Sequence, residues 1–130
     1  MKTRVRDVMV RGVVTVHLDT PIKEIAKILI ENDISGVVAV DDKGEAWGVI
    51  TDTDLVKCYA EGEIDAVAED VMSPQTLAVD PEMSLEDAAA FMCSNKIHRA
   101  FVMSARSAHV TKNFPVGVIS VTDIVRELAG

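Results

Sequence analysis

The chain contains one short phrase twice, and both copies carry the same polar residues in the same order. Residues 48–54 read GVITDTD, and residues 117–123 read GVISVTD. Each copy has a glycine, two β-branched residues, a hydroxyl residue and, three positions later, an aspartate. An apolar pattern with helical spacing follows each copy. The phrase therefore predicts that the chain is built from two versions of one strand-to-helix unit.

Further matches extend this repeat over most of the chain. Asp7-Val8-Met9 is repeated as Asp70-Val71-Met72, and Asn32 is matched by Asn95 at the same spacing. A short insertion between residues 103 and 117 lengthens the second copy. We therefore divide the chain into a first repeat, residues 1–62, and a second repeat, residues 63–130. Neither repeat is large enough to bury a comfortable core alone.

Each copy reads as β-α-β-β-α. The first copy has predicted strands at 13–16, 37–40 and 47–50, a helix that starts with Thr20 as N-cap and Pro21 as its first residue, and a second helix at 52–59. The second copy has predicted strands at 76–79, 100–103 and 116–119, a helix capped by Ser84 and a closing helix at 122–128. Residues 104–114 are predicted to form a long hairpin arm, most simply an exposed loop.

These elements predict an α+β fold in which the two sheets pack face to face with pseudo-twofold symmetry. The polar ends of the units would then meet across a cleft, which is a common place for a ligand site.

Composition excludes several classes of protein. The chain is 48% hydrophobic with a formal net charge of -8, which fits a folded domain and disfavours nonspecific binding to nucleic acid or anionic membrane. No apolar run has the roughly 18 residues that span a bilayer, and no signal peptide is visible, so we expect a cytoplasmic protein. Cys58 and Cys93 are predicted to be buried free thiols, and no metal-ligand spacing is present.

The ordered set of motifs resembles a tandem pair of CBS domains, also called a Bateman module. The matching residues include Val5 to Met9, Ile34 to Val38 and Gly48 to Asp54 in the first copy, and Ile97 to Val102 and Gly117 to Asp123 in the second. The resemblance covers nearly the whole chain. It implies a non-catalytic sensor or regulatory module that binds adenine nucleotides or adenosyl ligands: AMP, ADP or ATP first, with S-adenosylmethionine or NAD as further candidates. With no fused effector in the sequence, the resemblance implies a stand-alone module with an effector protein that the sequence does not identify.

The repeated hydroxyl and aspartate have two interpretations. Spacing alone fits a capping box, in which Ser or Thr caps a helix and the acidic residue reaches back, worth about 1 kcal/mol. The resemblance implies instead that Asp54 and Asp123 hold ribose hydroxyls, and that Thr51, Ser120 and Thr122 contact ribose or phosphate. A carboxylate accepts hydrogen bonds from both hydroxyls of a ribose, and a helix N-terminus favours phosphate.

The resemblance also implies composite pockets, with each clamp facing strand residues of the other copy. Thr51 and Asp54 would face Leu77, Ile97, His98 and Arg99; Ser120, Thr122 and Asp123 would face Val14, Ile34, Ser35 and Gly36. Because His98-Arg99 replaces Ser35-Gly36, the Thr51 pocket becomes the better candidate for a phosphorylated ligand. The plainer interpretation of His98-Arg99 is a surface pair that bonds the hairpin or an acidic neighbour.

Two other functions stay open. The chain could be a structural interaction module that dimerises and carries vestigial pockets, and a homodimer is expected in either case. An enzyme is the weakest alternative, because no histidine has a nucleophile or carboxylate at a recognisable catalytic spacing and the two motif aspartates lie in separate copies.

Overall fold

The computed structural model describes residues 2–73, 78–105 and 113–130, and these fall into two compact units. The first unit is Val14–Gln75, and the second unit combines Met1–Val13 with Thr76–Gly130. This division differs from the predicted repeats, 1–62 and 63–130. Residues 63–75 belong with the first unit and residues 1–13 with the second, so each unit contains a lead segment from outside its predicted repeat.

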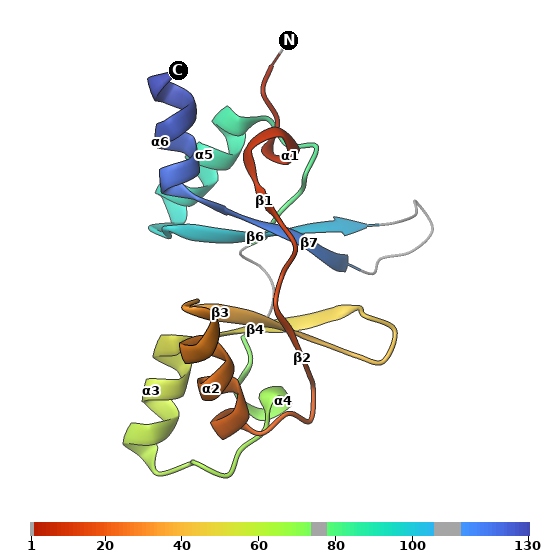
Figure 1. Cartoon of the computed structure of the whole chain (residues 1–130), viewed down its shortest axis with the longest axis vertical. Helices are drawn as coiled ribbons and strands as arrows, with labels where there is room; N and C mark the ends of the chain where they lie inside the picture. Colours follow the sequence, from red (N-terminus) through yellow and green to blue (C-terminus); the bar gives the residue numbers. More distant parts are fainter. Residues whose placement is uncertain (1, 74–77, 106–112) are drawn as a thin grey trace. The chain divides into compact units, whose positions relative to one another are not determined.

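The first unit has the predicted β-α-β-β-α order, followed by a short helix. Its elements are β2 (Thr15–His17), α2 (Ile22–Asn32), β3 (Gly36–Val40), β4 (Ala46–Thr51), α3 (Asp52–Glu61) and α4 (Ala68–Val71). β3 lies in the middle of the sheet, parallel to β2 and antiparallel to β4 (Figure 1).

The second unit repeats this order and adds two elements from the N-terminus. It contains α1 (Val5–Val8), β1 (Val10–Arg11), β5 (Ala78–Val79), α5 (Leu85–Asn95), β6 (Arg99–Ala105), β7 (Asn113–Ser120) and α6 (Val121–Ala129). The strands follow the order β1-β7-β6-β5. Both units therefore confirm the predicted α+β fold with two β-α-β-β-α repeats. Most of the predicted arm, residues 106–112, lies outside the described residues.

The first helix of each repeat forms for the reasons that the sequence suggested, with one correction. In α2, Ile22, Ile25 and Leu29 recur at helical spacing and are buried, and Asp33 ends the helix with a left-handed φ of 51°. Ser84 caps α5 as predicted, accepting the N–H of Asp87 at 3.1 Å. The prediction that Thr20 caps α2 is wrong. Pro21 occupies the N-cap, and the Thr20 hydroxyl accepts the N–H of His17 at 3.1 Å.

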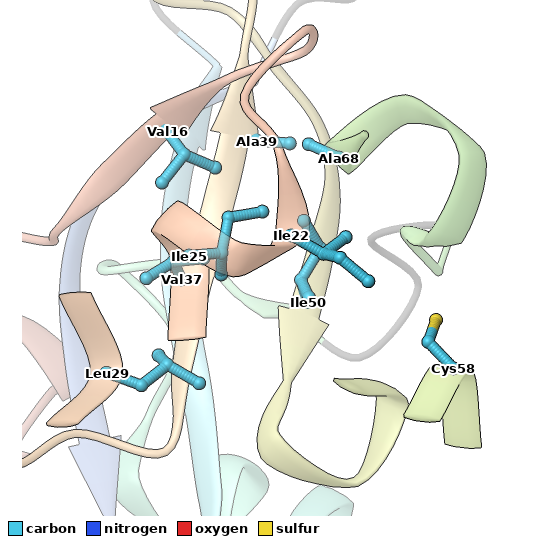
Figure 2. Close-up of a cluster of buried hydrophobic side chains, with 9 residues drawn as sticks. All are labelled: Val16, Ile22, Ile25, Leu29, Val37, Ala39, Ile50, Cys58 and Ala68. Carbon is cyan, nitrogen blue, oxygen red and sulfur yellow. The ribbon is translucent and has the colours of Figure 1, made fainter. Parts of the chain in front are cut away.

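The core of the first unit lies between the sheet and its helices. Figure 2 shows Ile22, Ile25 and Leu29 of α2 with Val37 of β3 and Ile50 of β4. Ile25, Val37 and Ile50 have no exposed surface. Fully burying such a side chain contributes about 1.5–3 kcal/mol. This packing fixes the end of β4, where the repeated phrase passes into α3.

The lead segments are integral to the units they join. Val5 of α1 is fully buried in the core of the second unit, and its N–H donates to the carbonyl of Met83 at 2.9 Å. Figure 1 shows the red α1 and β1 beside the blue β7 and α6. Residues 68–73 are joined to the first unit in the same way, by burial and by backbone hydrogen bonds. Ala68 is fully buried, and Ser73 and Val49 exchange two backbone hydrogen bonds of 2.9 Å. Each sheet therefore receives a crossing segment from a distant or following part of the chain.

Candidate functional site

The first repeated phrase builds a polar corner where β4 passes into α3. We call Thr51 and Asp54 the Thr51 clamp. The backbone N–H of Thr51 donates to Asp54 Oδ2 at 2.8 Å, and the Thr51 hydroxyl donates to the same oxygen at 3.1 Å. The Thr51 hydroxyl also lies 2.9 Å from that of Thr53. Asp54 Oδ1 has no partner among the described residues, so this clamp keeps one carboxylate oxygen for another donor.

The second phrase builds an equivalent corner between β7 and α6, with different bonding. We call Ser120 and Asp123 the Ser120 clamp. Ser120 N–H donates to Asp123 Oδ2 at 2.9 Å, and Asp123 N–H donates back to Ser120 Oγ at 3.2 Å. Asp123 Oδ1 lies 3.6 Å from Arg126 Nη1, in a pair whose side chains are 11% and 76% exposed. Here the second carboxylate oxygen already faces a cation.

The strand before each clamp is fixed to it by the same two contacts. Gly36 lies opposite Thr51 in the sheet, and the N–H of Asp52 donates to the carbonyl of Ser35 at 2.8 Å. The structure therefore gathers Ser35 and Gly36 at the Thr51 clamp. Ile34, just before them, is partly buried against the same core.

In the second unit, Arg99 lies opposite Ser120, and the N–H of Val121 donates to the carbonyl of His98 at 2.9 Å. His98 and Arg99 are exposed, and Ile97 packs partly buried against the core beside them. His98 and Arg99, which are predicted to face the Thr51 clamp from the other copy, are thus neighbours of the Ser120 clamp within their own unit. The composite pairing across the two copies stays a prediction.

Three predicted site residues remain: Val14, Thr122 and Leu77. Val14 is partly buried against the core of the first unit, and Thr122 is exposed in the first turn of α6. Leu77 lies outside the described residues. Sequence reasoning missed Arg126, although its position three residues after Asp123 on a helix was a visible signal for an ion pair. It also missed Thr53, which is the counterpart of Thr122.

A hollow of about 440 Å³ lies beside the Thr51 clamp, between α2 and α3. Its walls are apolar except for two carboxylates, Asp33 at the end of α2 and Asp52 at the start of α3. Its lining residues are Ala26, Leu29, Ile30, Asp33, Ile34, Asp52 and Leu55. The polar part of this hollow is therefore acidic.

The Cys58 thiol does not suit nucleophilic chemistry. Burial raises the pKa of the Cys58 thiol, and Glu63 raises that pKa further, so the thiol stays protonated at neutral pH. The prediction that Cys93 is buried is wrong, because it lies on the exposed side of α5.

In the part of the chain that the structure describes, no group of three histidine, cysteine or acidic side chains is arranged to hold a metal ion. Within the same residues, no helix combines the length and apolar character needed to cross a membrane.

Comparisons with known proteins agree with this architecture. The family model for the CBS domain matches twice, at residues 5–61 and 67–130. The chain is 30% identical over 122 residues to the CBS domain-containing protein YhcV of Bacillus subtilis, covering 92% of this chain and 81% of that protein. It belongs to the CBS-domain family and carries a tandem CBS pair.

Two solved structures resemble it over nearly their whole length. One is the CBS domain pair of protein MJ0100 in complex with 5′-methylthioadenosine and S-adenosyl-L-methionine, with 26% identity, a TM-score of 0.83, and coverage of 100% of this chain and 98% of that one. The other is CBSX2 in complex with AMP, with 25% identity, a TM-score of 0.83, and coverage of 98% and 96%. Both structures contain adenosyl compounds.

Proposed function

We propose that this CBS pair is a non-catalytic regulatory module that binds adenosyl ligands at its two clamps. The observation that carries the proposal is the clamp itself, built twice from a hydroxyl residue and an aspartate at the start of a helix. A carboxylate there can accept ribose hydroxyls, and the positive end of the helix dipole favours an anionic group.

The similar CBS pairs support an adenosyl ligand as the class, since one is bound to AMP and the other to 5′-methylthioadenosine and S-adenosyl-L-methionine. AMP, ADP and ATP are our first candidates. Ligand binding regulates an effector only by favouring one arrangement of the module over another.

A thermal-shift screen tests the function directly. Ligand at about 100 times its dissociation constant stabilises the folded protein by roughly 2.7 kcal/mol, which raises the melting temperature by several degrees. The screen uses AMP, ADP, ATP, S-adenosylmethionine and NAD, with the double variant Asp54→Asn/Asp123→Asn as the matched control. We expect a shift in the native chain and a much smaller one in the variant. No shift with any compound favours an interaction module with vestigial pockets, and turnover of ATP contradicts the non-catalytic assignment.

Dimerisation is a second proposed property, supported by apolar surface at equivalent positions of the two units. Val56 and Tyr59 on α3 are 67% and 81% exposed, and Val125 and Leu128 on α6 are 61% and 86% exposed. Apolar side chains repeated on one helix face are typical of a surface that another protein covers. We propose that a second copy of the chain covers them, giving a homodimer.

Sedimentation velocity at micromolar concentration tests the homodimer. We expect a dimer that Tyr59→Glu and Leu128→Glu dissociate, while Lys27→Glu, an exposed charge change on α2, leaves it intact. A monomeric native chain contradicts the proposal.

A further inference from the structure

The hollow between α2 and α3 is an apolar surface that the described residues leave open to solvent. Ile30 in its lining is 81% exposed, and the apolar surface continues at helical spacing along α3 through Val56 and Tyr59. Among the described residues that line the hollow, only Asp33 and Asp52 are charged. A partner that covers this surface should therefore be apolar and carry a base.

The second unit has an equivalent surface on α5 and α6 with a different charge. α5 packs beside α6 as α2 packs beside α3 (Figure 1). The left-handed residue that ends α5 is Lys96 where α2 has Asp33, and α6 begins with Val121 where α3 begins with Asp52. We call the exposed residues at these equivalent positions the α5–α6 face: Cys93, Lys96, Val121, Val125 and Leu128.

The two surfaces complement each other better than either complements itself. Two hollows brought together would gather four carboxylates, from Asp33 and Asp52 of both copies, and two α5–α6 faces would set Lys96 against Lys96. Like charges held together in a contact weaken it. A hollow against an α5–α6 face instead sets the two carboxylates against an ammonium. It also sets the bulky Ile30 against the smaller Cys93, its equivalent on α5.

We propose that the α5–α6 face of a second copy of this chain covers the hollow, so that the homodimer pairs unlike units. Each copy carries one hollow and one α5–α6 face, so the same contact is made twice about the twofold axis of the dimer. The carboxylates of each hollow then face a lysine and not their own copies. This inference rests on the proposed homodimer and adds which surfaces form it.

Exchanging the charges of the two helix ends tests the pairing of unlike units. Aspartate and lysine already occupy the same left-handed position in α2 and α5, so Asp33→Lys and Lys96→Asp fit the backbone, and circular dichroism verifies that the variants fold. We expect each single variant to raise the dimer dissociation constant about threefold or more in sedimentation, because it places like charges in the contact. The double variant Asp33→Lys/Lys96→Asp restores opposite charges and should return the constant to near its native value.

A matched control and the opposite pairing give different patterns. Lys43→Asp makes the same charge change in the exposed turn between β3 and β4, so it should leave the dissociation constant unchanged. If like units paired, Asp33→Lys would relieve the repulsion between two hollows, since the introduced lysine would meet the partner's Asp52. A dimer that Asp33→Lys leaves unchanged or tightens, or that the double variant fails to restore, overturns the inference.

A thiol cross-link provides a second readout, because Cys93 already lies exposed on α5 while Cys58 is buried. Ile30→Cys adds a thiol at the equivalent place on α2, and a short bis-maleimide joins thiols that face one another. We expect Ile30→Cys to form covalent dimers joined between positions 30 and 93, identified by mass spectrometry of the linked peptides. The native chain and Ile30→Cys/Cys93→Ser, each with one exposed thiol of the pair, should form few.

The outcomes separate this inference from the homodimer on which it rests. Covalent dimers joined between two positions 93 in the native chain, or between two positions 30 in Ile30→Cys/Cys93→Ser, show pairing of like units. They overturn the inference while the homodimer stands, and so does a dimer in which positions 30 and 93 are never joined. A native chain that sediments as a monomer overturns the homodimer and the inference together.

Discussion

Gly48 lies directly beneath the main-chain oxygen of Ser73, so closely that a Cβ on Gly48 would be 2.6 Å from that oxygen. The glycine of the repeated phrase is therefore required by the lead segment that crosses it. We predict that Gly48→Ala destabilises the fold by about 1–3 kcal/mol, because the added methyl forces the backbone pairing between Val49 and Ser73 apart. Urea denaturation followed by circular dichroism measures this.

Two controls define the cause. Gly117 has the same relation to Val10 in the second unit, where a Cβ would also lie 2.6 Å from the carbonyl oxygen, so Gly117→Ala should cost a similar amount. Ser73→Ala changes only an exposed side chain and leaves the main chain in place, so it should cost little. A Gly48→Ala protein as stable as the native chain would disprove the steric explanation.

Val5 belongs structurally to the second unit, so truncating its side chain should destabilise that unit. We predict that Val5→Ala lowers the free energy of unfolding by about 2 kcal/mol, because a fully buried side chain leaves a cavity. Hydrogen exchange should accelerate in α5 and β7, with α2 and β3 unaffected. Lys2→Ala, an exposed change in the same segment, is the control. Faster exchange confined to the first unit would contradict the assignment of this segment.

Asp54 should show that capping and ligand binding are separable. Asp54→Ala removes the acceptor of both the Thr51 N–H and the Thr51 hydroxyl, and we expect a loss of about 1 kcal/mol of stability without ligand. Asp54→Asn keeps an acceptor oxygen and should be nearly as stable as the native chain, yet lose the stabilisation that ligand gives at this clamp. Melting curves with and without 5′-methylthioadenosine measure both effects. Equal ligand stabilisation in the native chain and Asp54→Asn would leave capping as the only role of this residue.

His17 should make stability depend on pH. Its ring nitrogens lie 2.6 Å from Asp42 and 2.8 Å from Asp19, and these carboxylates raise the His17 pKa above its usual value of 6.5. A raised pKa means that the folded state binds the proton more tightly, so the contribution is complete below about pH 6.5 and is lost as pH rises through the folded-state pKa. An NMR titration of His17 measures that pKa, and Asp42→Asn should lower it. A native His17 pKa at or below 6.5 would contradict this prediction.

Local patterns allowed most of the elements to be predicted. The apolar spacing of Ile22, Ile25 and Leu29 identified α2, and the hydroxyl–aspartate spacing placed the starts of α3 and α6. These signals are local, because hydrophobic period and caps depend on residues a few positions apart. The same reasoning failed at Thr20, where the hydroxyl bonded backward to His17 instead of capping the helix.

The features that the sequence did not predict are those made by distant partners. β1 has only two residues, Val10 and Arg11, and it exists because β7 pairs with them from the other end of the chain. The exchange of lead segments leaves no periodic pattern in the sequence. The only local sign of it is the glycine at 48 and at 117, where the crossing segment passes too close for a side chain. At the site, the positions of Gly36 opposite Thr51 and of Arg99 opposite Ser120 depend on the register of the paired strands, which local spacing does not show.

Because of the exchanged lead segments, the two units become complete at different times during synthesis. The first unit is one continuous stretch, Val14–Gln75, so it can close as soon as that stretch has left the ribosome. The second unit needs residues 2–13, which emerge before the first unit, and α6, which emerges after it. Residues 2–13 therefore stay without their partners, with Val5 uncovered, until α6 has been synthesised. The two halves of this repeat protein are alike in form, but the cell completes one of them well before the other.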